Sequence, residues 1–101
     1  MPKIVVLFNL KAGTSVADYE KFARETDLPI VNALPSINRF EVLKAQNLLS
    51  GGDSPYQYIE ILDVNSMEQL GKDVSSETMQ KVAATFRSMA DNPLFIVTAA
   101  L

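Results

Sequence analysis

The chain has 101 residues, of which 9 are basic and 12 acidic, so its net charge is −3, and 48% of its residues are hydrophobic. This balance predicts one globular domain over residues 1–101, and no apolar run approaches the roughly 20 residues of a membrane span. The mild acidity argues against nucleic acid, which proteins bind mainly through clustered Lys and Arg. With no signal sequence and no cysteine, we expect a cytoplasmic protein.

The sequence contains neither histidine nor cysteine. An ordinary zinc site, a His-ligated haem and a Ser-His-Asp or Cys-His nucleophile are therefore excluded. A metal ion would have only Asp and Glu oxygens as ligands, which favours weakly held magnesium or calcium at best. We therefore expect no metal site and no bound cofactor.

Four segments have the pattern of β-strands. The first and last are runs of β-branched and large apolar residues on both faces, whereas the two middle segments alternate in polarity. A hairpin-type connection with two adjacent glycines, residues 46–55, joins the middle pair. The predicted strands span residues 4–10, 37–45, 56–64 and 94–101.

Apolar side chains at helical spacing predict the helices between these strands. The first helix spans residues 16–34, and Pro29 kinks it or divides it into two pieces. A short helix follows over residues 65–71 and ends at its glycine. The last helix spans residues 76–90, where an Asp-Asn-Pro sequence stops it.

The order of elements is β-α-β-β-α-β. Short connections and right-handed crossovers fold this order into a ferredoxin-like α+β domain, an antiparallel four-stranded sheet with helices on one face. Two helices cover only one face, so the other apolar face should be buried in a two-fold homodimer; the alternative is a monomer whose helices straddle both faces. Side-chain alternation predicts which apolar residues share a face of the sheet. One face carries Val5, Leu7, Phe95 and Val97, and the other carries Ile4, Val6, Phe8, Leu94 and Ile96.

A resemblance to a known family is carried by four segments: DYEKF (18–22), TDLPIV (26–31), LPSI (34–37) and YQYIEI (56–61). They resemble the RedY-like proteins of prodiginine, tripyrrole-pigment and related secondary-metabolite pathways. This family lies in the dimeric α+β barrel superfamily, where two ferredoxin-like subunits pack sheet against sheet. In prodiginine pathways it is associated with the branch that makes the methoxy-bipyrrole carbaldehyde. The resemblance implies a homodimeric barrel and a part in secondary-metabolite, including antibiotic, biosynthesis.

Asp27 departs from the superfamily pattern, because many relatives carry a histidine before the Leu-Pro step of the first helix. A mechanism that depends on histidine therefore cannot be carried over. Asp27 lies four residues after Ala23 and four before Val31, on the stripe that faces the sheet. A carboxylate there has a raised pKa if dry or a partner if ionised. The structural alternative is an N-cap for the helical turn that Pro29 restarts.

Three further polar residues are predicted near Asp27. Tyr58 and Glu60 share one face of the third strand, and Asn9 ends the neighbouring first strand. Together these residues predict a helix–sheet pocket with Asp27 or Glu60 as catalytic acid or base and Asn9 and Tyr58 as substrate-binding groups. The structural alternatives are a core Tyr58 whose hydroxyl reaches the surface and a Glu60 salt bridge across the dimer, for example to Arg39.

The expected function is that of a small, cofactor-free protein of prodiginine-type or pyrrole-pigment biosynthesis. It would act on or hold a heteroaromatic intermediate, and whether it is an enzyme stays open. The alternatives are a non-catalytic carrier of the intermediate and a structural dimer that stabilises a pathway enzyme. The expected partners are thus a second copy, a small heteroaromatic molecule and, in the last case, that enzyme. The interior of the dimeric barrel is the other possible place for the pocket.

Overall fold

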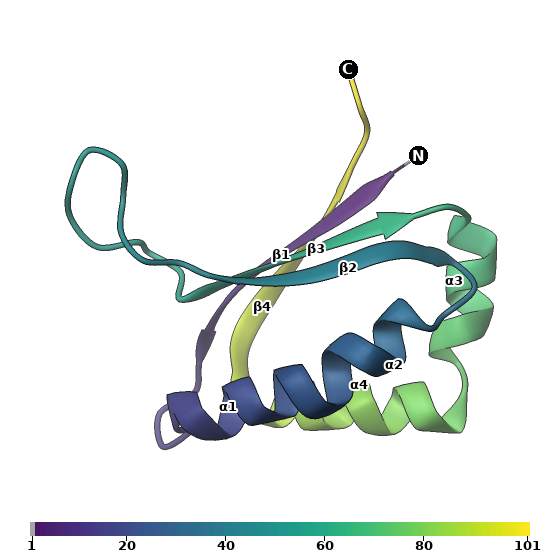
Figure 1. Cartoon of the computed structure of the whole chain (residues 1–101), viewed down its shortest axis with the longest axis horizontal. Coiled ribbons are helices and arrows are strands. Elements are labelled where there is room, and N and C mark those ends of the chain that lie inside the picture. The colour runs from purple at the N-terminus through teal and green to yellow at the C-terminus, as the bar shows by residue number, and fades with distance from the viewer. Residues whose placement is uncertain (1) are drawn as a thin grey trace.

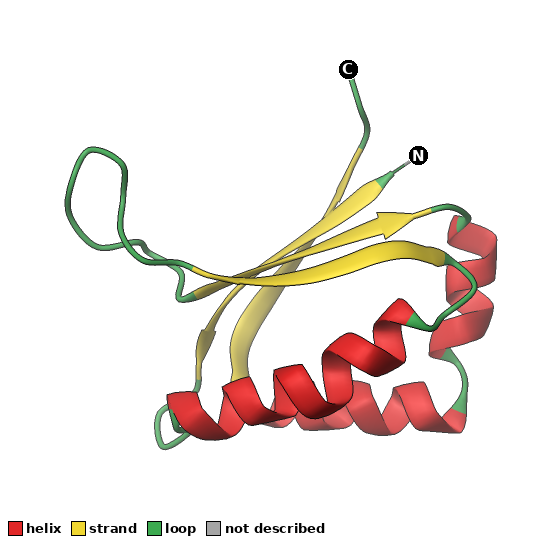
Figure 2. Ribbon diagram, viewed as in Figure 1, coloured by secondary structure: helices red, strands yellow, loops and turns green. Residues whose placement is uncertain are grey.

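The computed structural model describes residues 2–101 and contains a four-stranded antiparallel sheet with the helices on one side (Figures 1 and 2). The strand order is β2-β3-β1-β4, so β3 and β1 are central. This arrangement confirms the predicted ferredoxin-like α+β fold. The strands are β1 (Lys3–Leu10), β2 (Ile37–Lys44), β3 (Tyr58–Val64) and β4 (Ala90–Thr98).

The first helical region is continuous but changes its winding in the middle. A π-helical segment, η1 (Ala23–Asp27), separates α1 (Val16–Phe22) from α2 (Leu28–Asn32). The backbone N–H of Leu28 donates to the carbonyl of Ala23, five residues earlier. Pro29 explains this wider turn, because its ring has no N–H and crowds the carbonyl four residues before it. The predicted division into two pieces is therefore present as a π-helical segment.

The other two helices are α3 (Met67–Val74) and α4 (Glu77–Met89). The short helix α3 runs three residues past its expected end, because Gly71 does not adopt the left-handed conformation that closes helices. It begins after Ser66, whose hydroxyl accepts a hydrogen bond from the N–H of Gln69. None of the helices formed by residues 2–101 combines the length and the apolarity that crossing a membrane requires.

The strand β4 begins earlier than predicted, at Ala90. The Asp-Asn-Pro sequence does end α4, but it then continues directly as the first part of this strand. Asn92 has a positive φ of 44°, a conformation that asparagine tolerates well, and the pairing of β1 with β4 shifts between Leu7 and Asn9. This irregularity lets the chain pass from helix into strand without a separate loop.

The core lies between the sheet and the helices. Aromatic rings form its centre: Phe8 stacks on Tyr58 and meets Tyr19 and Phe86 edge to face. A second group of buried side chains lies toward α2 and the start of α4. The buried residues of the two groups are Val6, Phe8, Tyr19, Ala23, Tyr58, Phe86 and Ala90, and Val31, Ile37, Phe40, Val64, Met79 and Val82.

The sheet face away from the helices is apolar and open. The predicted pairing of faces is wrong for β4, because Phe95 pairs with Val6 and Val97 with Ile4, so both lie on the helix side. Strand register decides this, and a shift of one residue exchanges the two faces of a strand. By that register the apolar side chains of the open face are Val5, Leu7, Leu43, Ile59, Ile61, Leu94 and Ile96.

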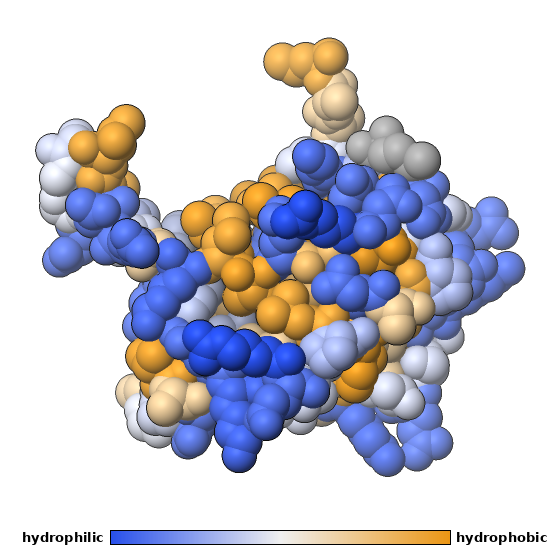
Figure 3. Space-filling model, viewed as in Figure 1, coloured by the Kyte–Doolittle hydropathy of each residue, from blue (hydrophilic) through white to orange (hydrophobic). Residues whose placement is uncertain are grey.

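The connection between β2 and β3, residues 45–57, projects from the body as an arm (Figure 1). Hydrogen bonds close its tip, from the N–H of Leu48 to the carbonyl of Gly52 and from the N–H of Gly51 to the carbonyl of Leu48. Leu48 and Leu49 are exposed there, and Figure 3 shows apolar side chains at the tip. The arm therefore presents two leucines to the solvent.

Candidate functional site

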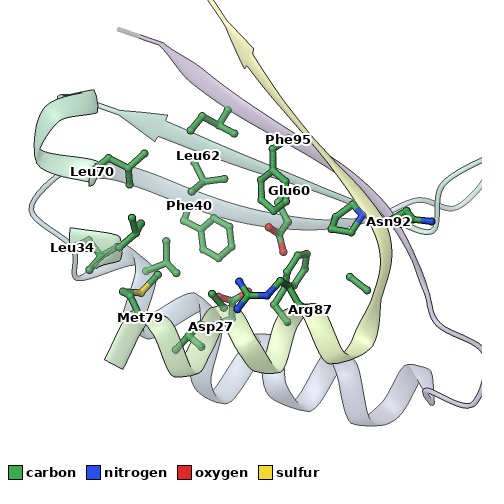
Figure 4. Close-up of a pocket in the computed structure, with 18 of the residues that line it drawn as sticks. Asp27, Leu34, Phe40, Glu60, Leu62, Leu70, Met79, Arg87, Asn92 and Phe95 are labelled. Atoms are coloured by element: carbon green, nitrogen blue, oxygen red, sulfur yellow. The ribbon is translucent and has the colours of Figure 1, made fainter. Parts of the chain in front are cut away.

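A cavity of about 570 Å³ lies between the helices and the sheet (Figure 4). Its walls are mainly apolar and include aromatic rings from β2 and α4. Four exposed polar residues also line it and mark the side on which it opens to solvent: Lys11, Arg87, Asp91 and Asn92. The apolar wall includes Val31, Phe40, Leu62, Leu70, Val82 and Phe86.

Two buried carboxyl groups line this cavity from opposite walls. Asp27 is the last residue of η1, and Glu60 lies in the middle of β3. Each is only 5% exposed, and both side chains point into the cavity (Figure 4). The structure therefore brings together the two residues predicted as catalytic acid or base.

The carboxyl group of Asp27 accepts no hydrogen bond from residues 2–101, and burial raises its pKa to about 6. The helical stripe that carries it, with Ala23 and Val31, is buried as predicted. The N-cap alternative is not supported. The backbone of Asp27 is helical, with φ −66° and ψ −54°, and its side chain makes no capping hydrogen bond. The π-helical turn carries the chain through Asp27 without a break, so no new helix start requires a cap.

Glu60 has its pKa raised to about 8, first by burial and then by the negative charge of Asp27. The hydroxyl of Tyr19 donates a hydrogen bond to its Oε2 at 3.4 Å, which acts in the opposite direction. Arg39 lies on the open face of the sheet and pairs with Glu41 at 2.8 Å, whereas Glu60 is buried on the helix side, so this geometry does not favour the alternative of a Glu60–Arg39 salt bridge. At neutral pH Glu60 is therefore protonated and Asp27 largely ionised.

Tyr58 lies beside this site but does not line the cavity. Its ring is buried in the aromatic core, 4.7 Å from that of Tyr19 between centroids. Its hydroxyl donates to Glu20 Oε2 at 2.7 Å, and the same carboxylate forms ion pairs with Lys44 and Arg24. The hydroxyl thus points toward a charged cluster at the outer side of α1, as in the core-aromatic alternative.

Asn9 also lies outside the cavity lining. Its side-chain N–H donates to the carbonyl of Pro55 at 3.0 Å, and its side-chain oxygen accepts from the N–H of Gln57 at 2.9 Å. The side-chain oxygen of Gln57 in turn accepts from the N–H of Leu10. In the structure Asn9 therefore anchors the base of the arm to the end of β1.

Tyr19 contacts the site although its position in the sequence gives no sign of this role. It lies on the same helical stripe as Asp27, two turns earlier, where an aromatic residue is typical of a core position. The polar side chains at the cavity opening were not predicted either. Lys11 follows β1, whereas Arg87 and Asn92 lie at the junction of α4 and β4, and no sequence pattern joins these two segments.

The chemistry available in this cavity is proton transfer and hydrogen bonding. Two carboxyl groups whose pKa values lie on either side of neutrality are suited to act as a base and an acid. No group of three or more potential metal-binding side chains is found within residues 2–101. Asp27 and Glu60 therefore constitute a candidate acid–base pair in an apolar enclosure.

Comparisons with known proteins identify the family of the chain. The model of the REDY-like protein HapK family matches residues 2–101. No curated protein sequence matches the chain.

Solved structures with low sequence identity share the fold. HapK from Hahella chejuensis has a TM-score of 0.79 and 22% identity, covering 100% of this chain and 93% of that chain. SnoaB, a cofactor-independent oxygenase from Streptomyces nogalater, has a TM-score of 0.78 and 14% identity over 99% and 92%. A dimeric ferredoxin-like protein of unknown function from Thermobifida fusca has a TM-score of 0.73 and 15% identity over 98% and 90%. By the family match over nearly its whole length, the chain belongs to the REDY-like HapK family.

Proposed function

We propose that the protein binds a planar heteroaromatic intermediate of secondary metabolism in the helix–sheet cavity, and that Asp27 and Glu60 move protons on it. One observation carries this proposal: two buried carboxyl groups face an apolar cavity from opposite walls, and one of them has no partner within residues 2–101. Burying an unpaired carboxyl group is costly, and a fold tolerates that cost where the group has a function.

The size and lining of the cavity support a small aromatic ligand. A volume of about 570 Å³ falls within the range of small-molecule sites. Phe40 and Phe86 line it together with aliphatic side chains, and such walls favour flat rings over flexible polar molecules. The ligand would enter on the side of Lys11 and Arg87, where the lining is exposed.

The protonation of the pair suggests how a ligand is held. At neutral pH the protonated Glu60 donates a hydrogen bond and the ionised Asp27 accepts one. A pyrrole-type N–H next to a carbonyl group presents the complementary pattern. In a tautomerisation, Asp27 takes the proton from the ligand N–H while Glu60 delivers its proton to the carbonyl oxygen. Asp27 then releases its proton to water and Glu60 regains a proton from water, so the step is redox-neutral and needs no co-reactant besides the solvent.

The family supports a role in secondary metabolism, and we extend it to prodiginine-type or pyrrole-pigment pathways on the resemblance of the sequence motifs. SnoaB is described as a cofactor-independent oxygenase, so this fold supports chemistry without a cofactor in that protein. We further propose a homodimer in which the apolar open face of the sheet is buried against a second copy. A patch of seven large aliphatic side chains on this face, three of them exposed and four half-buried, favours association.

Binding can be tested with pyrrole-2-carboxaldehyde as a probe, followed by amide NMR shifts. The parent protein should show saturable shifts at residues around the cavity. Asp27→Asn, which loses the charged acceptor, and Glu60→Leu, which loses the donor, should each weaken binding about tenfold, which corresponds to ~1.4 kcal/mol. The N-methyl derivative, which lacks the N–H donor, should bind weakly to the parent and be insensitive to Asp27→Asn.

Two controls make this test specific. Glu41→Gln changes a carboxylate on the open face and should leave probe binding unchanged, whereas Ala83→Phe fills the cavity and should abolish it. If the probe does not bind, or if the cavity variants bind it as tightly as the parent does, the proposed site is wrong. The interior of a dimeric barrel then becomes the candidate binding site. Faster exchange of the probe N–H with water in the presence of the parent protein than in free solution, slowed in Asp27→Asn, would indicate proton transfer. Binding without this faster exchange would identify a carrier.

A further inference from the structure

We propose that Tyr19 is a positioning residue for the Asp27–Glu60 pair: its hydroxyl holds Oε2 of Glu60 and leaves Oε1 as the oxygen that exchanges a proton with a ligand. This inference rests on the proposed function in taking the cavity as the site. It adds a residue that does not line the cavity, and it assigns different roles to the two oxygens of Glu60.

The ring of Tyr19 is held firmly. The side chain is fully buried, in contact with Phe8 edge to face at 5.5 Å between centroids and with Tyr58 at 4.7 Å. Phe22, on the same helix, lies 6.4 Å away on another side. Rings packed in this way leave the hydroxyl no alternative direction. Its position relative to β3 is therefore fixed by the aromatic core and does not depend on a ligand.

The hydroxyl of Tyr19 approaches Glu60 Oε2 at 3.4 Å. This is a long hydrogen bond, as is common in unliganded active sites, where such bonds shorten once a ligand is bound. Burial and the neighbouring Glu60 and Asp27 carboxyl groups raise the pKa of Tyr19 far above its ordinary value. The hydroxyl therefore keeps its proton throughout the range in which the pair titrates, and it is a permanent donor.

The surroundings of Glu60 make this donor important. From η1 it faces Asp27, whose charge disfavours ionisation, and from α1 it faces Tyr19, which favours it. Lys11 and Arg87 line the cavity as well, but within residues 2–101 no ion pair reaches the Glu60 carboxyl group. Tyr19 is thus the group that keeps the ionised form of Glu60 accessible after it has given up its proton.

The structure supplies a matched control. Tyr58 belongs to the same aromatic cluster and is equally buried, but its hydroxyl donates to Glu20 on the outer side of α1. The pKa of Glu20 is lowered to about 2, through its hydrogen bonds with Lys44 and Tyr58. Each tyrosine therefore serves a different glutamate, and removing either hydroxyl should affect only its own partner.

A pH titration of the unliganded protein by NMR of the glutamate side-chain carboxyl carbons tests this assignment. In Tyr19→Phe the pKa of Glu60 should rise by about 0.5 to 1 pH unit, the size expected for losing one hydrogen bond to a carboxylate. In Tyr58→Phe the pKa of Glu60 should stay at its parent value while that of Glu20 rises. An unchanged or lowered Glu60 pKa in Tyr19→Phe would overturn the proposal.

A second measurement on the parent protein covers the case in which Tyr19→Phe does not fold. The phenol carbon of Tyr19 should show an inflection with the same midpoint as the carboxyl carbon of Glu60, and that of Tyr58 should not. If the chemical shift of the Tyr19 phenol carbon does not change as Glu60 titrates, the positioning role is refuted. Neither measurement uses a ligand. A failure of probe binding would therefore contradict the proposed function without affecting the test of Tyr19.

Discussion

Replacing Glu60 by glutamine removes a carboxyl group that the folded protein holds in its protonated form. Burial and the charge of Asp27 raise its pKa from 4.5 to about 8. Between these two values the folded protein binds more protons than the unfolded chain, so its stability falls as the pH rises through this interval. Glutamine has no proton to lose, and Glu60→Gln should remove this part of the pH dependence.

The size of the effect follows from the same pKa values. Each pH unit in the interval costs ~1.4 kcal/mol, so ionising Glu60 in the folded state costs about 5 kcal/mol. Small domains have total stabilities of about 5–15 kcal/mol, so this loss is large. Asp27 adds a similar but smaller loss at lower pH, between 3.8 and about 6. The effect of Glu20 on the pH dependence of stability has the opposite sign, because its pKa is lowered. Its contribution to folding stability is lost only as the pH falls below 4.5 toward 2.

The measurement is urea-induced unfolding followed by circular dichroism at several pH values and one fixed protein concentration, because association makes stability concentration-dependent. Between pH 6 and 8 the parent should lose about 3 kcal/mol, and Glu60→Gln should lose almost none. Glu41→Gln, on the opposite face of the sheet, should keep the slope of the parent. A parent stability that is constant or rising between pH 6 and 8 would refute the reasoning.

Three further predictions concern other parts of the structure. Leu7→Asp places a charge on the open face and should give a monomer of 11.1 kDa by light scattering, whereas Val97→Asp, on the helix side, should leave the dimer intact. Asn9→Ala removes two hydrogen bonds to the arm, so amide exchange at the base of the arm should accelerate about fivefold or more, with probe binding unchanged. Asp27→Asn should lower the pKa of Glu60, because a neighbouring negative charge is removed; an unchanged value by carbon NMR would contradict the coupling.

The element order and the fold class could be predicted because their signals are local. Alternating polarity marks strands, apolar spacing marks helices, and the sequence of these elements admits few topologies. The same periodicity placed Asp27 on the buried stripe of its helix and Glu60 on the same strand face as Tyr58. The lack of histidine and cysteine in the sequence restricts the chemistry as well, whatever the fold.

The remaining features depend on which segments meet in space. The register of β4 against β1 put Phe95 and Val97 on the helix side, and no pattern within either strand specifies that register. Tyr19 reaches Glu60 across 41 residues of chain. The sequence predicted Asn9 as a site residue, and only the folded structure shows its two hydrogen bonds to the arm. Within each helix and strand, the sequence by itself determined which side chains share a face, because side-chain direction follows a local period. Only the tertiary structure decided which polar groups find partners in the core, because a hydrogen bond requires a donor and an acceptor within about 3.5 Å, and packing sets that distance.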